Sequence, residues 1–334
     1  MIQKKRLLIY THFGGRFANQ LFVQAHFMAF LFEHPDDFDF INLSFTPYRR
    51  LLENTSKQPI CIYPTHHKRW KSFRWMNYLL NIKLPKVSHI QKATTTRILY
   101  TFAKNLGISA LLVGYINPPD LVGHRIDSLD LAYPNDIRLF YQANTTLVTG
   151  WGFRSWALVE KHQDKIREGL MFNSTYTQVA QKFIQNLRKQ YDFLIGVLIR
   201  QGDYRGWSEG KYYFETEEYI NWMKQAKEVF GATRNVAFVV ASDDKQDSSK
   251  FQDLNVYFAT GFAVGKGHYV ENIAELSMCD IVMTPPSTFG VWAAFLGDIP
   301  VLPVGRTQVI SENNLLKNHI FDALKHPYLS VSIK

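Results

Sequence analysis

Residues 193–204, FLIGVLIRQGDY, join an uninterrupted apolar run to a charged end and decide how the second half of the chain folds. A short continuous apolar run is typical of a strand that is buried on both faces of a parallel sheet. The run stops at Arg200, and a glycine and an aspartate follow within three residues. We therefore expect a central parallel strand over residues 193–199 whose carboxyl end brings polar side chains to the rim of the sheet.

Helical and apolar segments alternate outward from this strand. Asn173 and Ser174 offer an N-cap for a helix that runs to about Lys189, directly before the strand. Further helices are predicted over residues 216–230, 271–278 and 287–296, and further strands over residues 236–241, 256–259, 281–284 and 300–304. This alternation predicts a doubly wound parallel sheet, in which ligands bind outside the carboxyl ends of the strands.

The first half of the chain shows the same alternation less clearly. Residues 7–10 predict a strand, a glycine turn follows, and apolar residues then recur at helical spacing from Phe17 to Ala29. Strands are also predicted over residues 38–45, 110–116 and 146–149, whereas residues 55–95 show no clear pattern. With 334 residues, 46% of them hydrophobic, the chain can fill two cores. We expect two domains, residues 1–172 and 173–334.

Charge and cysteine content narrow the class of protein. The chain has 38 Lys and Arg against 29 Asp and Glu, a net charge of +9, which favours anionic partners. Its densest basic stretches, residues 4–6 and 66–69, are short and isolated, so we do not expect nucleic-acid binding. Cys61 and Cys279 lie far apart, which argues against a disulfide framework or a cysteine metal site.

Hydropathy predicts no transmembrane segment. The apolar run at residues 7–10 is too short for a signal sequence. The most apolar stretch, residues 17–32, is interrupted by four polar side chains and makes a poor membrane span. We expect a cytoplasmic protein, for which peripheral membrane contact and the oligomeric state stay open.

Four polar segments follow predicted strands, and the first contains Gly14, Gly15, Arg16 and Asn19. A glycine loop lets a ligand approach the backbone, and the helix N-terminus that follows favours an anion. An equally good interpretation is a glycine turn in which Arg16 faces solvent and Asn19 caps the helix.

The second segment supplies Arg200, Gly202 and Asp203 at the end of the central strand. The planar guanidinium suits bidentate binding of a diphosphate and keeps its charge as a leaving group departs. The alternative is an Arg200–Asp203 surface pair of little energetic value.

The third segment, Ser242, Asp243 and Asp244, follows the strand at residues 236–241. Its carboxylates can accept hydrogen bonds from a ribose or a base, or they can cap the next helix. The fourth, residues 285–289, opens a helix with Pro-Pro-Ser-Thr-Phe. Its hydroxyl and backbone N–H groups form an anion site, although an ordinary N-cap explains the same residues.

In this order, the segments resemble the fucosyltransferase superfamily, which groups bacterial α-1,2-fucosyltransferases with protein O-fucosyltransferases and α-1,6-fucosyltransferases. GGRFANQLF (14–22) is similar to the family's glycine loop, and GWGFRSW (150–156) is similar to a segment before the donor domain of the α-1,2 enzymes. IRQGDY (199–204) resembles their His-x-Arg-Arg-Gly-Asp-Tyr motif, and ASDD (241–244) and CDIVMTPPSTFGVWAAFLG (279–297) complete the series.

The resemblance implies a GT-B-like α/β fold with two Rossmann-like domains, an N-terminal acceptor-side domain and a C-terminal nucleotide-sugar donor domain, and the active site in the cleft between them. It also implies an inverting transfer of fucose from GDP-fucose to a glycan hydroxyl, with an α-1,2 linkage expected. The chain has no HExxH, Walker A lysine or Cys-x-x-Cys motif. We expect no metal and no cofactor, so that the partners are the donor and the glycan acceptor alone.

Residue roles follow from the same resemblance. The arginine that matches Arg200 binds the donor β-phosphate, and the helix start at residues 287–289 holds the diphosphate. Asp243 and Asp244 match the segment where guanine and ribose contacts are expected, and Asn19 belongs to the loop near the reacting sugar. The expected donor-binding residues are Gly14, Gly15, Arg16, Asn19, Arg200, Gly202, Ser242, Asp243, Asp244, Ser287, Thr288 and Phe289.

A general base is needed as well, and Glu209 lies in the loop where some family members carry a catalytic glutamate. Asp203 is the alternative base, although its closeness to Arg200 favours a structural pairing. The residues expected to take part in catalysis are Asn19, Arg200, Asp203 and Glu209. Aromatic side chains that could line an acceptor cleft, or simply belong to the core, are Trp151, Trp207, Tyr212 and Tyr213. Residues 261–268 have the composition of a mobile lid.

The chain departs from the family pattern at three positions. The motif's histidine is replaced by Leu198, its second arginine by Gln201, and the asparagine before the Ser-Thr-Phe helix start by Pro286. One donor contact and one positive charge are lost. Two alternatives therefore stay open, a transferase for another nucleotide sugar and a protein that binds a nucleotide sugar without catalysis.

Overall fold

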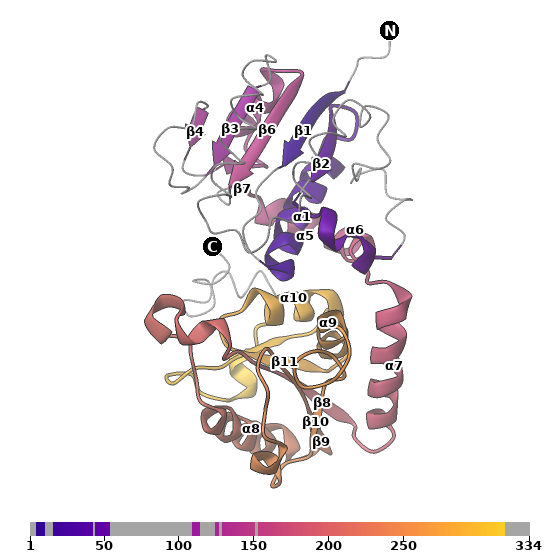
Figure 1. Cartoon of the computed structure of the whole chain (residues 1–334), viewed down its shortest axis with the longest axis vertical. Coiled ribbons are helices and arrows are strands. Elements are labelled where there is room, and N and C mark those ends of the chain that lie inside the picture. The colour runs from indigo at the N-terminus through magenta and orange to yellow at the C-terminus, as the bar shows by residue number, and fades with distance from the viewer. Residues whose placement is uncertain are drawn as a thin grey trace. The chain divides into compact units, whose positions relative to one another are not determined.

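The computed structural model describes residues 5–10, 16–42, 44–53, 109–113, 124–126, 129–150 and 153–317. The chain divides into two compact units, Met1–Leu170 and Met171–Lys334, each with a sheet of its own (Figure 1). Among the described residues, no helix is both long and apolar enough to span a membrane.

The N-terminal unit contains a five-stranded parallel sheet in the order β2-β1-β6-β3-β4. Its strands are β1 (Arg6–Tyr10), β2 (Phe38–Asn42), β3 (Ser109–Val113), β4 (His124–Ile126) and β6 (Thr145–Gly150), and β5 (Leu129–Asp130) pairs with β7 (Phe153–Arg154). Its helices are α1 (Phe17–Glu33), η1 (Thr46–Leu51), α4 (Pro134–Tyr141), α5 (Trp156–Lys161) and α6 (Gln163–Gly169). Strands were predicted at β1, β2, β3 and β6, whereas β4, β5, β7, α4, α5 and α6 were not predicted.

Helix α1 is buried over most of its surface, because apolar residues occupy all of its faces. Phe27 stacks on Phe40 of β2 with ring centroids 4.3 Å apart. The N-cap of α1 is Arg16, which makes no side-chain capping bond, and Asn19 lies inside the helix. The alternative of an Asn19 cap is therefore wrong.

Strand β2 ends at Asn42, three residues before the predicted end. The Asn42 side chain accepts a hydrogen bond from the backbone N–H of Phe45 at 3.0 Å and donates to Gln24 Oε1 at 2.9 Å. Such a local bond gives the backbone an alternative to the sheet ladder, so the chain turns here.

The C-terminal unit contains a second five-stranded parallel sheet in the order β10-β9-β8-β11-β12. Its strands are β8 (Phe193–Ile199), β9 (Val236–Ser242), β10 (Val256–Phe258), β11 (Ile281–Thr284) and β12 (Val301–Pro303). Its helices are α7 (Ser174–Arg188), α8 (Thr216–Gly231), α9 (Tyr269–Ser277) and α10 (Thr288–Gly297). The predicted elements of this half are confirmed, with bounds within two residues, and β8 is the central strand.

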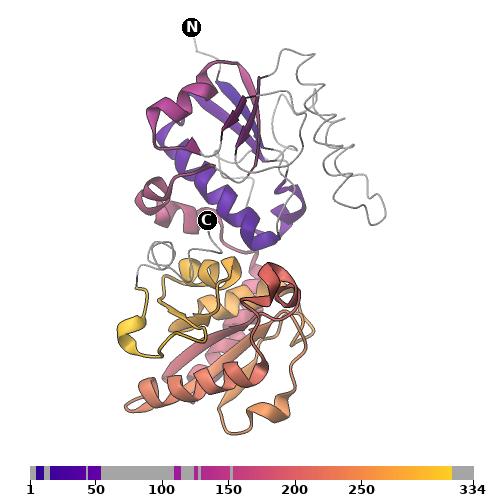
Figure 2. The ribbon, with the colours of Figure 1, turned by 90° about the vertical axis from the view of Figure 1, so that its left-hand side faces the viewer.

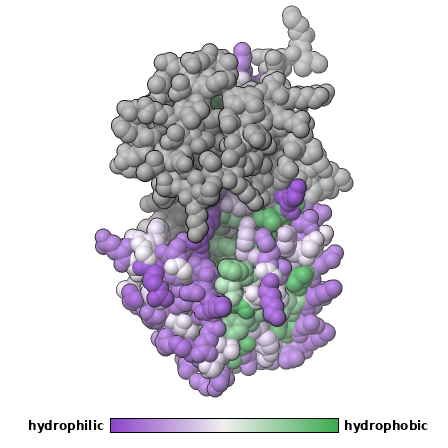
Figure 3. Space-filling view, in the orientation of Figure 1, coloured by the Kyte–Doolittle hydropathy of each residue, from purple (hydrophilic) through white to green (hydrophobic). Residues whose placement is uncertain are grey.

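Side chains of β8 alternate between the two faces of this sheet. Ile195 and Val197 pack in the core on the α8 side, whereas Leu194 packs with Ile184 and Leu187 of α7 on the other side. Figure 2 shows α8 below the sheet of this unit (Figure 2). On the face seen in Figure 3, the surface of the C-terminal unit is mostly hydrophilic, and a strip of hydrophobic residues runs between hydrophilic margins (Figure 3). Both faces of the central strand are thus covered, and only its carboxyl end reaches the rim.

Candidate functional site

Arg200 leaves the carboxyl end of β8 and is held by two carboxylates. Its Nη1 lies 2.7 Å from Asp243 Oδ2 and its Nη2 donates to Asp203 Oδ1 at 2.6 Å. The guanidinium also lies over the ring of Tyr204, 4.7 Å from its centroid. Only 12% of the Arg200 side chain is exposed. The predicted Arg200–Asp203 pair is present, but it is one part of a larger and mostly buried arrangement.

Asp243 fixes the loop that carries Arg200. Its Oδ1 accepts the backbone N–H groups of Gln201 at 2.8 Å and Gly202 at 3.2 Å. A Cβ atom at Gly202 would lie 2.9 Å from Asp243 Oδ2, so glycine permits this close approach. The alternative that Asp243 or Asp244 caps the next helix is wrong, because the short helix η5 (Ser248–Phe251) is capped by Asp247.

The two sequence neighbours of Asp243, Ser242 and Asp244, differ in how far they are exposed to solvent. Ser242 is buried, and its Oγ accepts hydrogen bonds from the backbone N–H of Asp244 at 3.1 Å and from Gln246 Nε2 at 3.2 Å. Asp244 is exposed, and its Oδ1 accepts the backbone N–H of Lys245 at 2.8 Å. Ser242 therefore shapes the loop from within, whereas the Asp244 carboxylate reaches the surface of the rim.

Tyr204 connects the Arg200 loop to the start of α10, a role that was not predicted. Its hydroxyl donates to the backbone oxygen of Pro286, and the Ser287 side chain lies beside it. Burial raises the pKa of Tyr204 above its ordinary value, although the Arg200 charge opposes this shift. Tyr204 ends the segment IRQGDY (199–204), and the only sequence signal of its role is an aromatic residue directly after Gly202 and Asp203.

Ser287 is the N-cap residue of α10 by its backbone conformation, and its carbonyl accepts the N–H of Val291 at 3.1 Å. Its side chain makes no capping bond, so the ordinary side-chain cap offered as an alternative is not formed. Ser287 is buried, and Thr288 and Phe289 are half-buried. The first N–H groups of a helix have no acceptor within the helix and attract anions.

Three of the four predicted segments meet at one edge of the sheet. Ile199 pairs with Ser242, and Met283 pairs with Val197 in the same parallel register. The residues that follow β8, β9 and β11 therefore leave the sheet at its carboxyl edge. Of the first segment, exposed Arg16 and half-buried Asn19 belong to the N-terminal unit, and Gly14 and Gly15 lie outside the described residues.

Glu209 is exposed in the turn after Trp207, where the backbone is unusual. Ser208, Glu209 and Gly210 have φ values of 50°, 57° and 74°. Left-handed conformations at non-glycine residues cost free energy and occur more often at functional sites. The turn therefore holds Glu209 in a strained backbone conformation with its side chain exposed.

Aromatic side chains form a continuous stack beside this turn. Trp207, 40% exposed, lies between Tyr204 and Tyr212 with ring centroids 5.0 and 5.1 Å apart. Tyr212 is buried and belongs to the core, whereas the Tyr213 hydroxyl donates to Glu215 at 3.0 Å. Trp151 lies outside the described residues. Trp207 is thus the exposed member of the stack.

Thr260, the residue directly before the segment predicted as a lid, contacts two buried glutamates. Thr260 Oγ1 lies 2.7 Å from Glu271 Oε2 and 2.6 Å from Glu275 Oε1. A Cβ atom at Gly267 would lie 2.0 Å from Glu271 Oε2. Burial raises the pKa of Glu275 to about 7. Close packing against Glu271 therefore explains why residue 267 is a glycine.

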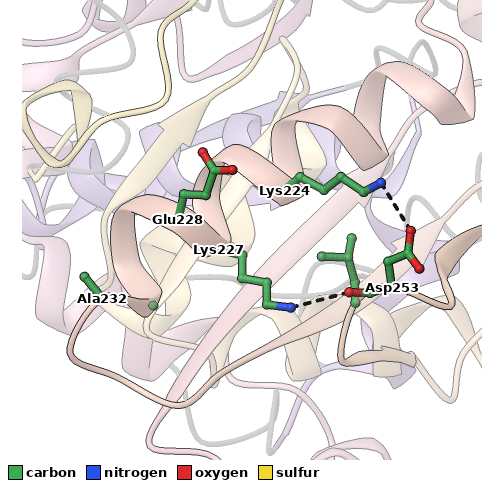
Figure 4. A pocket seen from close by; sticks show the side chains of 7 residues that line it. Lys224, Lys227, Glu228, Ala232 and Asp253 are labelled. Atoms are coloured by element: carbon green, nitrogen blue, oxygen red, sulfur yellow. Dashed lines mark hydrogen bonds and ion pairs between the residues drawn. The ribbon is translucent and has the colours of Figure 1, made fainter.

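A depression of about 470 Å³ lies at the other edge of the sheet, against the C-terminal half of α8 (Figure 4). It is lined by Lys224, Lys227 and Asp253, and Lys224 Nζ lies 3.3 Å from Asp253 Oδ2. Helix α8 begins at the carboxyl edge and ends at the amino edge, so this depression is remote from Arg200. In the part of the chain that the structure describes, no three His, Cys, Asp or Glu side chains are placed to hold a metal ion.

Comparisons with known proteins agree with this geometry. The sequence profile of glycosyl transferase family 11 matches residues 161–314, a little less than half of the chain. That region contains all of the C-terminal sheet and three of the four predicted segments. No curated protein matches the chain by sequence.

Solved structures resemble nearly the whole chain. A mutant of Arabidopsis thaliana FUT1 in complex with GDP has a TM-score of 0.54 at 11% identity, over 93% of this chain and 73% of that one. POFUT1 in its apo form has a TM-score of 0.53 at 12% identity, over 91% of this chain and 99% of that one. This likeness confirms the predicted α/β fold of the GT-B type.

Proposed function

We propose that this chain is a member of the fucosyltransferase superfamily and that it transfers fucose from GDP-fucose to a glycan hydroxyl without a metal ion. We propose further that the reaction inverts the anomeric carbon and forms an α-1,2 linkage. The family 11 match across the predicted donor domain supports the fucosyl donor. FUT1 in the compared structure is bound to GDP, the product that such a donor leaves behind.

One observation carries the proposal: Tyr204 joins Arg200 to the N-terminus of α10. The Arg200 guanidinium lies on the Tyr204 ring, and the Tyr204 hydroxyl is bonded to Pro286, directly before the N-cap residue Ser287. A fixed positive charge and a helix N-terminus therefore converge at the carboxyl edge of the sheet. Both favour the two negatively charged phosphates of a nucleoside diphosphate.

In the proposed reaction, an acceptor hydroxyl oxygen bonds to the anomeric carbon while the bond from that carbon to the β-phosphate oxygen breaks. The electron pair of the broken bond leaves with GDP, so negative charge grows on the diphosphate. Arg200 and the start of α10 stabilise this charge, and their orientation is fixed before the reaction. Loss of one such donor typically reduces the rate about a hundredfold to a thousandfold.

The hydroxyl proton needs an acceptor, and we assign it to the Glu209 carboxylate. Glu209 is exposed, while the other candidate, Asp203, is bonded to Arg200 at 2.6 Å. Trp207 next to this turn offers an aromatic face on which the apolar face of a sugar ring can pack.

Donor binding requires that Arg200 release one of its carboxylate partners. Arg200, Asp203 and Asp243 together carry a net negative charge, which opposes a diphosphate. The Asp203 side chain is 44% exposed and the Asp243 side chain only 16% exposed. We infer that the diphosphate displaces Asp203 from Nη2, whereas Asp243 stays in place as the permanent partner.

The test is calorimetric titration of GDP and GDP-fucose in the presence of EDTA, with wild type, Arg200→Ala and Arg200→Lys. We expect binding by the wild type that is lost in Arg200→Ala and weakened in Arg200→Lys, which cannot bind in a bidentate manner. Arg234→Ala is the matched control, since Arg234 pairs with Glu312 at 3.3 Å and lies before β9, at the opposite edge.

Each other outcome favours a different function. Failure of the wild type to bind either ligand would rule out the fucosyl donor, and a panel of other nucleotide sugars would then be titrated. Binding without release of GDP in the presence of any glycan acceptor would instead indicate a non-catalytic nucleotide-sugar-binding protein.

A further inference from the structure

Gln201 stands where the family motif has a second arginine, yet it is buried. Only 5% of its surface is exposed, although it lies between Arg200 and Gly202 at the rim. Its Nε2 donates to the backbone oxygen of Phe214 at 2.9 Å. The Gln201 side chain is therefore directed into the protein, while its neighbour Arg200 carries the charge of the rim.

Gln201 closes a ring of three hydrogen bonds with two other polar side chains. Gln201 Nε2 donates to Thr216 Oγ1 at 3.3 Å, Thr216 Oγ1 donates to Gln246 Oε1 at 3.0 Å, and Gln246 Nε2 donates to Gln201 Oε1 at 2.9 Å. Within the ring, each side chain donates one hydrogen bond and accepts one, so the three hydrogen bonds run in the same donor-to-acceptor direction around it. Amides and hydroxyls have both donor and acceptor atoms, which such a ring requires.

The ring joins three segments that are far apart in the sequence. Gln201 belongs to the loop after β8, Thr216 begins α8, and Gln246 lies in the loop after β9. Gln246 Nε2 also reaches Ser242 Oγ at 3.2 Å. The ring therefore connects the loop that carries Arg200 to the loop that carries Asp243, in addition to the direct contacts between those two residues.

We propose that Gln201, Gln246 and Thr216 are positioning residues that set the geometry of Arg200 and Asp243. They act without contact to the donor, and their significance for transfer rests on the proposed function. Glutamine is required at position 201 because arginine has no acceptor atom and cannot receive the Gln246 Nε2 hydrogen bond. The missing arginine of the motif is thus compensated by loop rigidity and not by another charge.

The test compares Thr216→Val, which removes the hydroxyl at nearly constant volume, with Thr216→Ser, which keeps it. The first readout is amide hydrogen exchange of the ligand-free protein. In Thr216→Val, residues 200–205 and 242–246 are expected to exchange about tenfold faster, since two ring bonds are lost. Thr216→Ser is expected to match the wild type.

The second readout is the affinity for GDP. Thr216→Val is expected to bind GDP about tenfold more weakly than the wild type. Gln201→Arg is expected to weaken GDP binding despite its added positive charge. A gain of GDP affinity in Gln201→Arg would overturn the proposal. It would show instead that the wild-type glutamine merely lacks a contact that the family's arginine makes with the donor.

The two readouts separate this proposal from the proposed function. Faster exchange that stays within the first turn of α8, or in only one of the two loops, would overturn the positioning role whatever the ligand. A wild type that binds no GDP, with both loops loosened in Thr216→Val, would leave the ring as the organiser of these loops but reject GDP-fucose as donor.

Discussion

Arg200 Nη1 lies 2.7 Å from Asp243 Oδ2, and this ion pair joins the loops after two neighbouring strands of the C-terminal sheet. Asp243 also accepts two backbone N–H groups from the Arg200 loop. One carboxylate therefore determines both the path of the loop and the direction of the guanidinium. The rim is organised before any ligand is bound.

Asp243→Asn is expected to lower the free energy of unfolding by about 1–3 kcal/mol and to weaken GDP binding about tenfold. Asparagine keeps an acceptor for the backbone N–H groups of Gln201 and Gly202 but loses the charge that orients Arg200. Urea unfolding and calorimetry measure the two effects.

Asp203→Asn is the matched control for this change. The Asp203 side chain is 44% exposed, so its loss is expected to alter the free energy of unfolding by less than about 1 kcal/mol. Removal of its negative charge is expected to tighten GDP binding a few-fold. Equal effects of the two substitutions would contradict the assignment of Asp243 as the permanent partner.

Glu209→Gln is expected to reduce kcat about a hundredfold or more and to leave GDP affinity unchanged, because a general base acts on the acceptor and not on the diphosphate. Glu209→Gly is expected to lose the same activity while raising the free energy of unfolding by about 1 kcal/mol, since φ at this position is 57°. Steady-state kinetics and urea unfolding measure the changes. A variant of either kind with wild-type kcat would exclude Glu209 as the base.

Gly290→Ala is expected to lower the free energy of unfolding by about 1–3 kcal/mol and to weaken GDP binding. A Cβ atom there would lie 2.3 Å from Thr284 Oγ1, so α10 would have to move away from β11. Gly231→Ala is the control, because its Cβ would meet no atom closer than 3.8 Å. Thermal unfolding and GDP titration should separate the two variants, and equal behaviour would show that α10 can shift without consequence.

Glu275→Gln tests the buried carboxyl group. Its pKa of about 7 in the folded protein lies above the ordinary value of 4.5, so between these values the folded state keeps a proton that the unfolded state loses. The free energy of unfolding of the wild type should therefore fall as the pH rises from about 4.5 to 7, by the order of 3 kcal/mol in total, and then level off.

Glutamine resembles the protonated form of Glu275 and can keep the contacts with Thr260. Glu275→Gln is therefore expected to be more stable than the wild type at pH 8 and similar to it at pH 4.5, in urea unfolding at both pH values. Glu228→Gln, on the exposed side of α8, is the control. An identical pH dependence in wild type and Glu275→Gln would show that Glu275 is not the group that titrates.

The C-terminal sheet was predictable because most of its strands are buried on both faces. A strand such as β8 must then be apolar throughout, and each helix between strands must present an apolar face to the sheet. The hydrophobic pattern of each segment is therefore enough to predict the order of strands and helices along the chain. In the N-terminal unit, α4, α5 and α6 have eight, six and seven residues. Such helices complete only about two turns, too few for a clear helical period.

The sequence by itself determined that Arg200, the Asp243 segment and the Ser287 segment each follow a buried strand. Parallel strands end at the same edge, so these residues had to share it. Only the tertiary structure decided which side chains touch there. The ion pair of Arg200 with Asp243, the bridge from Tyr204 to Pro286 and the ring through Gln201 join residues 15 to 82 positions apart. Such contacts depend on strand order and on the depth of each side chain, which local periodicity does not encode.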